Sequence, residues 1–113
     1  MNSVNVTGRL VDDPKLGKAG EHDVAELRLA VNRGDKAVFI NVKAFEREGR
    51  NAAEYLTKGS LVGVTGRIQQ DQWTSPEGES RHSAHYIVAE RIDYLETRMA
   101  AAARGASVDA VGI

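Results

Sequence analysis

The sequence contains no cysteine, which excludes disulfide bonds, thiolate metal sites, iron–sulfur clusters and cysteine nucleophiles. It also has no long apolar run. The longest, Met99 to Ala103, is far shorter than the roughly 20 residues that cross a bilayer, so no membrane segment is expected and the cytoplasm is the default location. Basic residues are not in excess, since 15 Lys and Arg stand against 16 Asp and Glu. Charge alone therefore favours no partner.

Motifs of catalysis are missing as well. No GxxxxGK[ST] loop and no GxSxG turn occurs, and no serine belongs to a recognisable set of nucleophile, base and orienting acid. His82 and His85 are three residues apart in a predicted strand, so they point to opposite faces and do not suit one metal ion. The sequence predicts a protein that is not an enzyme and that has neither a metal site nor a cofactor.

What the sequence does contain is the alternation of apolar and polar residues that is typical of strands. The length of 113 residues fits one domain. We expect strands near residues 4–10, 24–31, 38–45, 62–69 and 82–90, with Ile68 on the core face of the fourth. The expected fold is all-β with one short helix, in the order βββαββ.

The helix and the last turn are predicted from local signals. Asn51 followed by Glu54 reads as a capping box, which starts a helix over 52–58, and Gly59 suits the residue that closes it. Ser75 to Gly78 has the composition of a hairpin turn between the last two strands. The domain is expected to span residues 1–96, with 97–113 as a short flexible tail.

The third strand carries the most informative pattern. Phe39, Asn41, Lys43 and Phe45 share one face, opposite Val38, Ile40 and Val42. In a small barrel only one face turns inward, so outward aromatics mixed with a cation resemble a stacking platform for bases. On these residues alone, a second interpretation stays open, in which a loop or another subunit covers the two phenylalanines.

Trp73 favours the stacking platform. It is the only tryptophan, it lies near a hairpin tip, and its neighbours Gln72 and Thr74 offer no apolar surroundings that would bury it. Arginines on or beside the outer strand faces are candidates for phosphate contacts. They are Arg9, Arg28, Arg33, Arg67 and Arg81.

Several separated motifs, in the right order, resemble the bacterial-type single-stranded DNA-binding protein family. The similarity covers residues 1 to about 95. It runs through Gly8-Arg9-Leu10 with Asp13-Pro14, VAELRLAVNR (24–33), FINVKAF (39–45), EYLTKGSLV (54–62), GRI (66–68) and the WTSPEG segment from Trp73. The resemblance implies an oligonucleotide-binding fold, a five-stranded barrel. It also implies a homotetramer without enzymatic activity.

The resemblance assigns roles to residues that match the family's pattern. It implies base stacking by Phe39, Phe45 and Trp73. From their positions on or beside the outer strand faces, the expected polar and basic contacts to the nucleic acid are Arg9, Arg28, Arg33, Asn41, Lys43 and Arg67. The implied function is sequence-tolerant binding of single-stranded DNA, which protects exposed strands in DNA replication, recombination and repair. The implied location is the cytoplasm, in association with the nucleoid.

This chain also departs from the family's pattern. Gln69, Asp71 and Gln72 stand where a basic run is frequent, which predicts weaker attraction for phosphate. The connection between the second and third strands is short and lacks the further stacking aromatic that family members often carry. The tail from Thr97 holds two arginines and one aspartate, so the acidic tip that recruits replication and repair proteins is not evident. An alternative function is an oligomeric adaptor of a replication assembly with weak affinity for nucleic acid.

Overall fold

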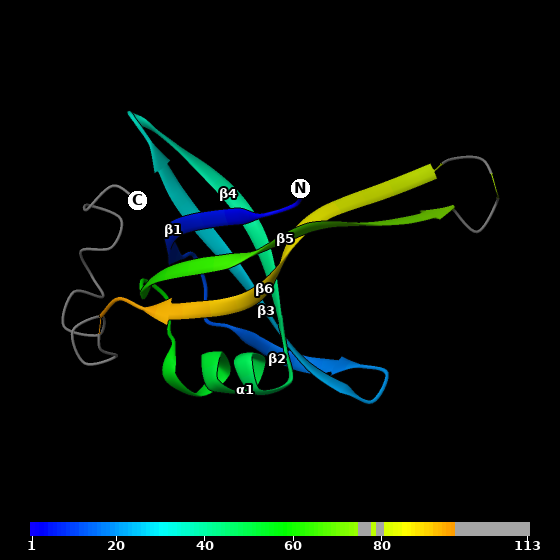
Figure 1. Cartoon of the computed structure of the whole chain (residues 1–113), viewed down its shortest axis with the longest axis horizontal. Coiled ribbons are helices and arrows are strands. Elements are labelled where there is room, and N and C mark those ends of the chain that lie inside the picture. The colour runs from blue at the N-terminus through cyan, green and yellow to red at the C-terminus, as the bar shows by residue number, and fades with distance from the viewer. Residues whose placement is uncertain (75–77, 79–80, 97–113) are drawn as a thin grey trace.

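The computed structural model describes residues 1–74, 78 and 81–96, with only the backbone of Arg81 and His82. Its strands form a ring, and one helix lies across an end of that ring (Figure 1). The elements are β1 (Val4–Leu10), β2 (Lys15–Ala19), β3 (His22–Arg33), β4 (Lys36–Phe45), α1 (Glu46–Tyr55), β5 (Leu61–Thr74) and β6 (Arg81–Tyr94). Among the residues described, no helix is long and apolar enough to cross a membrane.

The sheet closes on itself through β1. Its strands follow the order β1-β5-β6-β4-β3-β2, and β1 pairs with β3 as well as with β5. All pairs are antiparallel except β4 with β6, which are parallel and are joined only at Val42 and Lys43 of β4. This ring with one helix between β4 and β5 is the oligonucleotide-binding fold that the sequence predicts.

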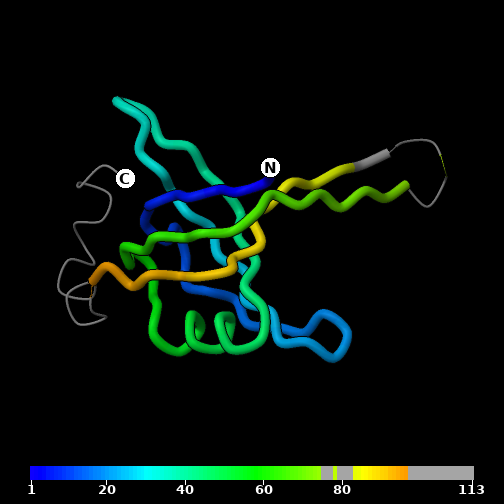
Figure 2. Tube along the Cα trace, viewed as in Figure 1, coloured from blue at the N-terminus to red at the C-terminus, as the bar shows by residue number. Residues whose placement is uncertain are grey.

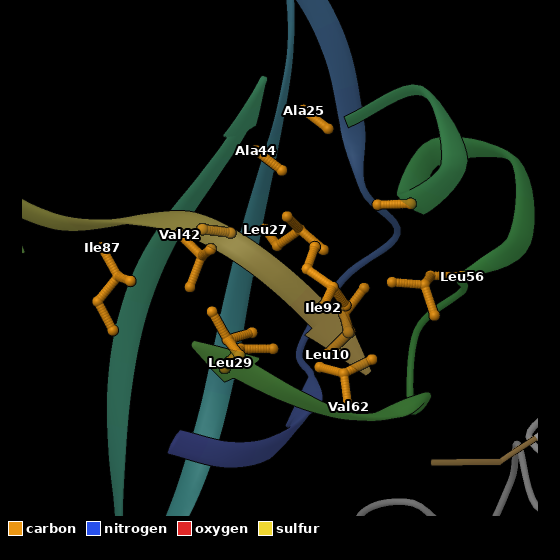
Figure 3. Close-up of a cluster of buried hydrophobic side chains, with 13 residues drawn as sticks. Leu10, Ala25, Leu27, Leu29, Val42, Ala44, Leu56, Val62, Ile87 and Ile92 are labelled. Carbon is orange, nitrogen blue, oxygen red and sulfur yellow. The ribbon is translucent and has the colours of Figure 1, made fainter. Parts of the chain in front are cut away.

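The core fills the inside of the ring with one face of β1, β3, β4, β5 and β6. Leu29 and Val42 are buried at 0% and 1% exposure, and they meet Leu10, Val62 and Ile87 from three other strands (Figure 3). Leu56, just after the helix, closes one end of this cluster. Because side chains alternate between faces, the residues between these positions point outward. The outer faces of β3 and β4 are therefore available for contacts.

The β5–β6 hairpin extends well beyond the barrel (Figure 2). From Arg67 to Thr74 every residue of β5 is exposed, whereas Val62 and Val64 are buried in the core. Asn2 supports the base of the hairpin: its side chain donates to the carbonyl of Ile68 and accepts from the Ile68 amide, both at 2.9 Å. The hairpin therefore reaches away from the core as a two-stranded ribbon.

The structure has one strand more than the sequence predicts. β2 pairs with β3 from Lys15 opposite Glu26 to Ala19 opposite His22. All five residues of β2 are exposed, so no apolar alternation marks it in the sequence. Gly20 supplies the turn with a φ of 64°. The segment from Gly17 to Gly20, which has the form of a GxxG loop, belongs to this hairpin.

The predicted helix boundaries are wrong. The helix begins at Glu46 and ends at Tyr55, so Asn51 lies inside it and does not cap it. The N-cap residue is Phe45, which makes no side-chain capping hydrogen bond, while Glu46 and Glu48 bring negative charge to the first turn. Gly59 has the expected positive φ of 90°. It lies in the connection to β5, after the helix has ended.

One core assignment is also wrong, and two predictions lie outside the described residues. Ile68 has the same parity as Val62 and Val64, but it is 51% exposed because β5 has already left the barrel there. The strands on both sides of the predicted turn do pair, with Thr74 opposite Arg81. Residues 75–77 of that turn and the predicted tail at 97–113 are not among those that the structure describes.

Candidate nucleic-acid interface

The outer face of β4 carries the predicted alternation. Phe39 is 55% exposed and Asn41 is exposed, whereas Val42 and Ala44 are buried and Ile40 packs partly against the core. Val38, on the face predicted to turn inward, is 44% exposed, so the alternation with burial holds only from Ile40 onward. Across the pair with β3, Arg28 lies opposite Asn41. Its guanidinium carbon is 5.4 Å from the centre of the Phe39 ring, within the range of a cation–π contact. One aromatic and one cation thus already form a joint surface.

A groove of about 400 Å³ runs beside this face, between β3 and β4 on one side and the base of the β5–β6 hairpin on the other. The groove contains charges of both signs. Its cations are Lys15, Arg28 and Lys43, and its carboxylates are Asp12, Asp13, Glu26 and Asp71. Asn41, His85 and Tyr86 add polar and aromatic groups. The groove therefore offers cations for phosphates without a net positive charge.

Lys43 lies at the centre of the groove wall. Its ammonium is 4.4 Å from the centre of the Tyr86 ring and 3.9 Å from Oδ2 of Asp71. The Tyr86 hydroxyl donates to Oδ1 of Asp71 at 3.1 Å. Burial of the ring, together with the adjacent carboxylate of Asp71, raises the pKa of Tyr86. The hydroxyl therefore keeps its proton at neutral pH.

Trp73 stands further out on the hairpin. It is 50% exposed, pairs with His82 of β6, and has the same parity on β5 as Asp71. The structure thus places the tryptophan on the same side of the ribbon as the groove lining. Phe39 and Trp73 come from different strands, and the cations Arg28 and Lys43 of β3 and β4 line the groove.

The other predicted site residues are spread more widely. Phe45 is half-buried at the end of β4, where it precedes α1. Arg33 is exposed at the turn between β3 and β4, opposite Lys36. Arg67 is exposed at the base of the hairpin, 3.7 Å from Glu90. None of these three lines the groove.

Arg9 has a structural environment of its own. Its side chain is 16% exposed, donates to the carbonyl of Gly59 at 3.0 Å and pairs with Glu96 at 3.2 Å. The structure does not bring Arg9 together with the groove residues. Nothing is described for the side chain of Arg81.

Sequence analysis missed Tyr86 and His85 as groove residues and did not connect Asp71 with Lys43. Tyr86 falls in a predicted strand, between an exposed and a buried neighbour. An aromatic residue in such a position is the signal that could have indicated a groove residue. The contact between Lys43 and Asp71 depends on how β4 meets β6 and how β6 meets β5. No local sequence pattern indicates the register of these strand pairs.

An oligonucleotide-binding barrel whose outer face carries exposed aromatic rings beside cations defines a class of protein, the nucleic-acid-binding modules. Comparison with known proteins then gives the particular family. Residues 1–95 match the single-strand binding protein family, and the chain belongs to it. This is a family of DNA-binding proteins and not of enzymes.

The similarity to curated relatives extends over most of the chain. A single-stranded DNA-binding protein of Halalkalibacterium halodurans is 38% identical over 120 aligned positions, which cover 99% of this chain and 71% of the relative. Single-stranded DNA-binding protein 1 of Staphylococcus aureus strain MSSA476 is 37% identical over 87% of this chain and 67% of its own length. Single-stranded DNA-binding protein 2 of strain COL is also 37% identical, over 87% of this chain and 76% of the relative.

Proposed function

We propose that this protein binds single-stranded DNA without strong sequence preference, along the outer face of β3 and β4 and the inner side of the β5–β6 hairpin. The observation that carries the proposal is the exposure of two large rings, Phe39 and Trp73, at 55% and 50%. Bases of any identity stack on such rings, because every base has a π face. Family membership and the names of the relatives support DNA as the ligand.

Cations beside the rings supply the contacts to the backbone. Arg28 and Lys43 line the groove, and Asn41 lies between them on the same surface. Arg33 and Arg67 extend the basic positions toward the β3–β4 turn and the hairpin base. We assign these residues to phosphate and sugar contacts and Phe45 to a stacking role near α1. Arg9, held by Gly59 and Glu96, is not part of the proposed surface.

The proposed biological role follows from the ligand. A protein that coats single strands without reading their sequence protects them during replication, recombination and repair. The proposal places the protein in the cytoplasm with the nucleoid, where chromosomal single strands arise. It includes a homotetramer, since in the described part of the chain residues 4–8 of β1 pair only with β5 and leave their other edge for a second copy.

Titration with a thymidine oligonucleotide, followed by the emission of Trp73, tests the binding surface. Trp73 is the only tryptophan, so its emission reports on one place. We expect quenching on binding. Measured by the anisotropy of a fluorescently labelled oligonucleotide, which needs no tryptophan, Trp73→Ala and Phe39→Ala should each weaken affinity several-fold or more, since stacking contributes about 1 to 3 kcal/mol per base.

Tyr55→Ala is the matched control, because Tyr55 is 49% exposed but lies on α1, outside the groove. Its affinity should equal that of the wild type. A matched double-stranded oligonucleotide should bind more weakly than the single strand. If Trp73 emission stayed constant at saturation and Phe39→Ala lost oligomerisation and not affinity, the rings would be interface residues, and the adaptor function would replace the one proposed.

A further inference from the structure

Lys43 is a groove cation with two close contacts, and one of them is with an acidic side chain. Its ammonium is 3.9 Å from Oδ2 of Asp71 and rests over the Tyr86 ring. Lys43 belongs to β4 and Asp71 to β5, so the pair bridges the groove from one wall to the other. The carboxylate of Asp71 thus occupies a position next to this cation.

Asp71 is itself fixed in place by a second partner. The Tyr86 hydroxyl donates to Oδ1 of Asp71 at 3.1 Å, while Oδ2 faces Lys43. Tyr86 is only 8% exposed, so its ring is a firm support for the hydrogen bond. The two carboxylate oxygens therefore have two different tasks. One anchors Asp71 to β6 and the other faces the ammonium.

We propose that Asp71 is an internal competitor for Lys43, an acidic group that stands in for a DNA phosphate when no DNA is bound and that the phosphate must displace. The inference rests on the proposed function and deepens it. Carboxylate and phosphate are both oxyanions that accept from an ammonium. Asp71 thus sets the affinity and the salt dependence of binding, by withholding one cation.

The geometry keeps the free-energy cost of exchanging carboxylate for phosphate low. The Lys43 and Asp71 side chains are 30% and 52% exposed, and their distance lies near the outer limit of an ion pair. Exposed pairs of this kind contribute little to stability. Lys43 can therefore turn from the carboxylate to a phosphate while the cation–π contact with Tyr86 remains. The role of Asp71 is one of tuning affinity and not of holding the fold.

Asp71→Asn tests the proposal, because it removes the charge and keeps the shape and an oxygen that accepts from Tyr86. We expect the affinity for a thymidine oligonucleotide at low salt to rise about two- to fivefold, in line with the strength of an exposed ion pair. The plot of log affinity against log salt should steepen by up to about 0.7, the value for one more phosphate contact to a single strand.

A double-mutant cycle separates the specific contact from a change in overall charge. In a Lys43→Met background, Asp71→Asn should give no gain in affinity and no steeper salt dependence. Asp93→Asn is the matched control: it removes the same charge and breaks an ion pair with Arg91 of 3.2 Å at the opposite end of β6. Its salt dependence should stay that of the wild type. Circular dichroism checks that each variant is folded, and Lys43→Gln replaces Lys43→Met if the latter is not.

The wild-type titration decides the proposed function first, through the quenching of Trp73. If the wild type binds and quenches but Asp71→Asn changes neither affinity nor salt dependence, the inference about Asp71 is overturned while the DNA-binding function stands. A gain that persists without Lys43, or that Asp93→Asn reproduces, also overturns it. Absence of binding by the wild type overturns both.

Discussion

At Gly66 there is no room for a side chain. This glycine lies on β5 next to the irregularity in pairing with β6, where the register shifts between Thr65 and Gly66. A Cβ atom built there would lie 2.0 Å from the carbonyl oxygen of Val88 and 3.1 Å from a methyl carbon of Ile87. Both contacts belong to β6, and the closest one is backbone. Gly66 therefore allows β5 and β6 to approach closely at the point where the hairpin leaves the barrel.

We therefore expect Gly66→Ala to lower the free energy of unfolding by about 1 to 3 kcal/mol or more, as overpacking in a core does. Urea denaturation measures the change. Gly17→Ala is the matched control, since nothing lies within 4 Å of a Cβ at this position on β2, and its effect should stay within about 0.5 kcal/mol. Equal stability of the two variants would show that β5 and β6 can separate locally at no cost.

Single residues also show which parts of the site are readable from sequence. The exposure of Phe39 and Trp73 follows from alternation and from the polar neighbours of the tryptophan, and the structure confirms it. The contacts of Asp71 with Lys43 and Tyr86 were not predictable. They join three strands, and their geometry depends on the parallel β4–β6 register, which no local pattern encodes.

At the scale of elements, the sequence predicts the strands of the core better than their neighbours. β1, β3 and β4 alternate because one face is buried in each, and alternation is what sequence analysis detects. β2 has no buried residue and was missed. β5 runs further than predicted because its outer part pairs with β6 beyond the barrel and needs no apolar face. β6 runs further at its other end, where Ile92 pairs with Val64 and is buried in the core.

The helix α1 illustrates how tertiary packing can override a local signal. Asn51 and Glu54 have the spacing of a capping box, yet the helix begins five residues before Asn51, directly after β4. Ala52 and Gly49 are its buried residues, so its position is set by packing against the barrel. Asn51 sits in the helix interior, where asparagine has a lower propensity than alanine.

This placement predicts that Asn51→Ala leaves stability unchanged or raises it by up to about 0.5 kcal/mol. Loss of a true N-cap would cost about 1 kcal/mol instead. Asn51→Gly sharpens the comparison, because glycine in a helix interior is about 0.5 to 1 kcal/mol worse than alanine, whereas glycine at an N-cap costs only a few tenths. Thermal unfolding of both variants shows which of the two is more stable. If glycine were the more stable of the two, Asn51 would be the cap.

For the whole molecule, residues 4–8 of β1 leave a short stretch of strand edge that suits self-association. β1 pairs with β5 from Val4 to Arg9 but meets β3 only at Arg9 and Leu10. We expect light scattering to give the mass of four chains of 12.3 kDa each. A dilution series shows whether the assembly dissociates. A monomer mass at micromolar protein would contradict the tetramer and leave the groove as a site within a single chain.

The closure of the ring through β1 also has a consequence for how the protein is made. β1 is synthesised first, but its main partner β5 follows the whole of β2, β3, β4 and α1. Pairings that are distant in sequence form late, because the entropy of loop closure must be overcome first. On the ribosome, the inner faces of β3 and β4 thus lack their contacts with β5 and β6 until those strands emerge. The hairpin that supplies Trp73 and Asp71 is therefore also the part that completes the barrel, so a nascent chain acquires its fold and its binding surface in the same step.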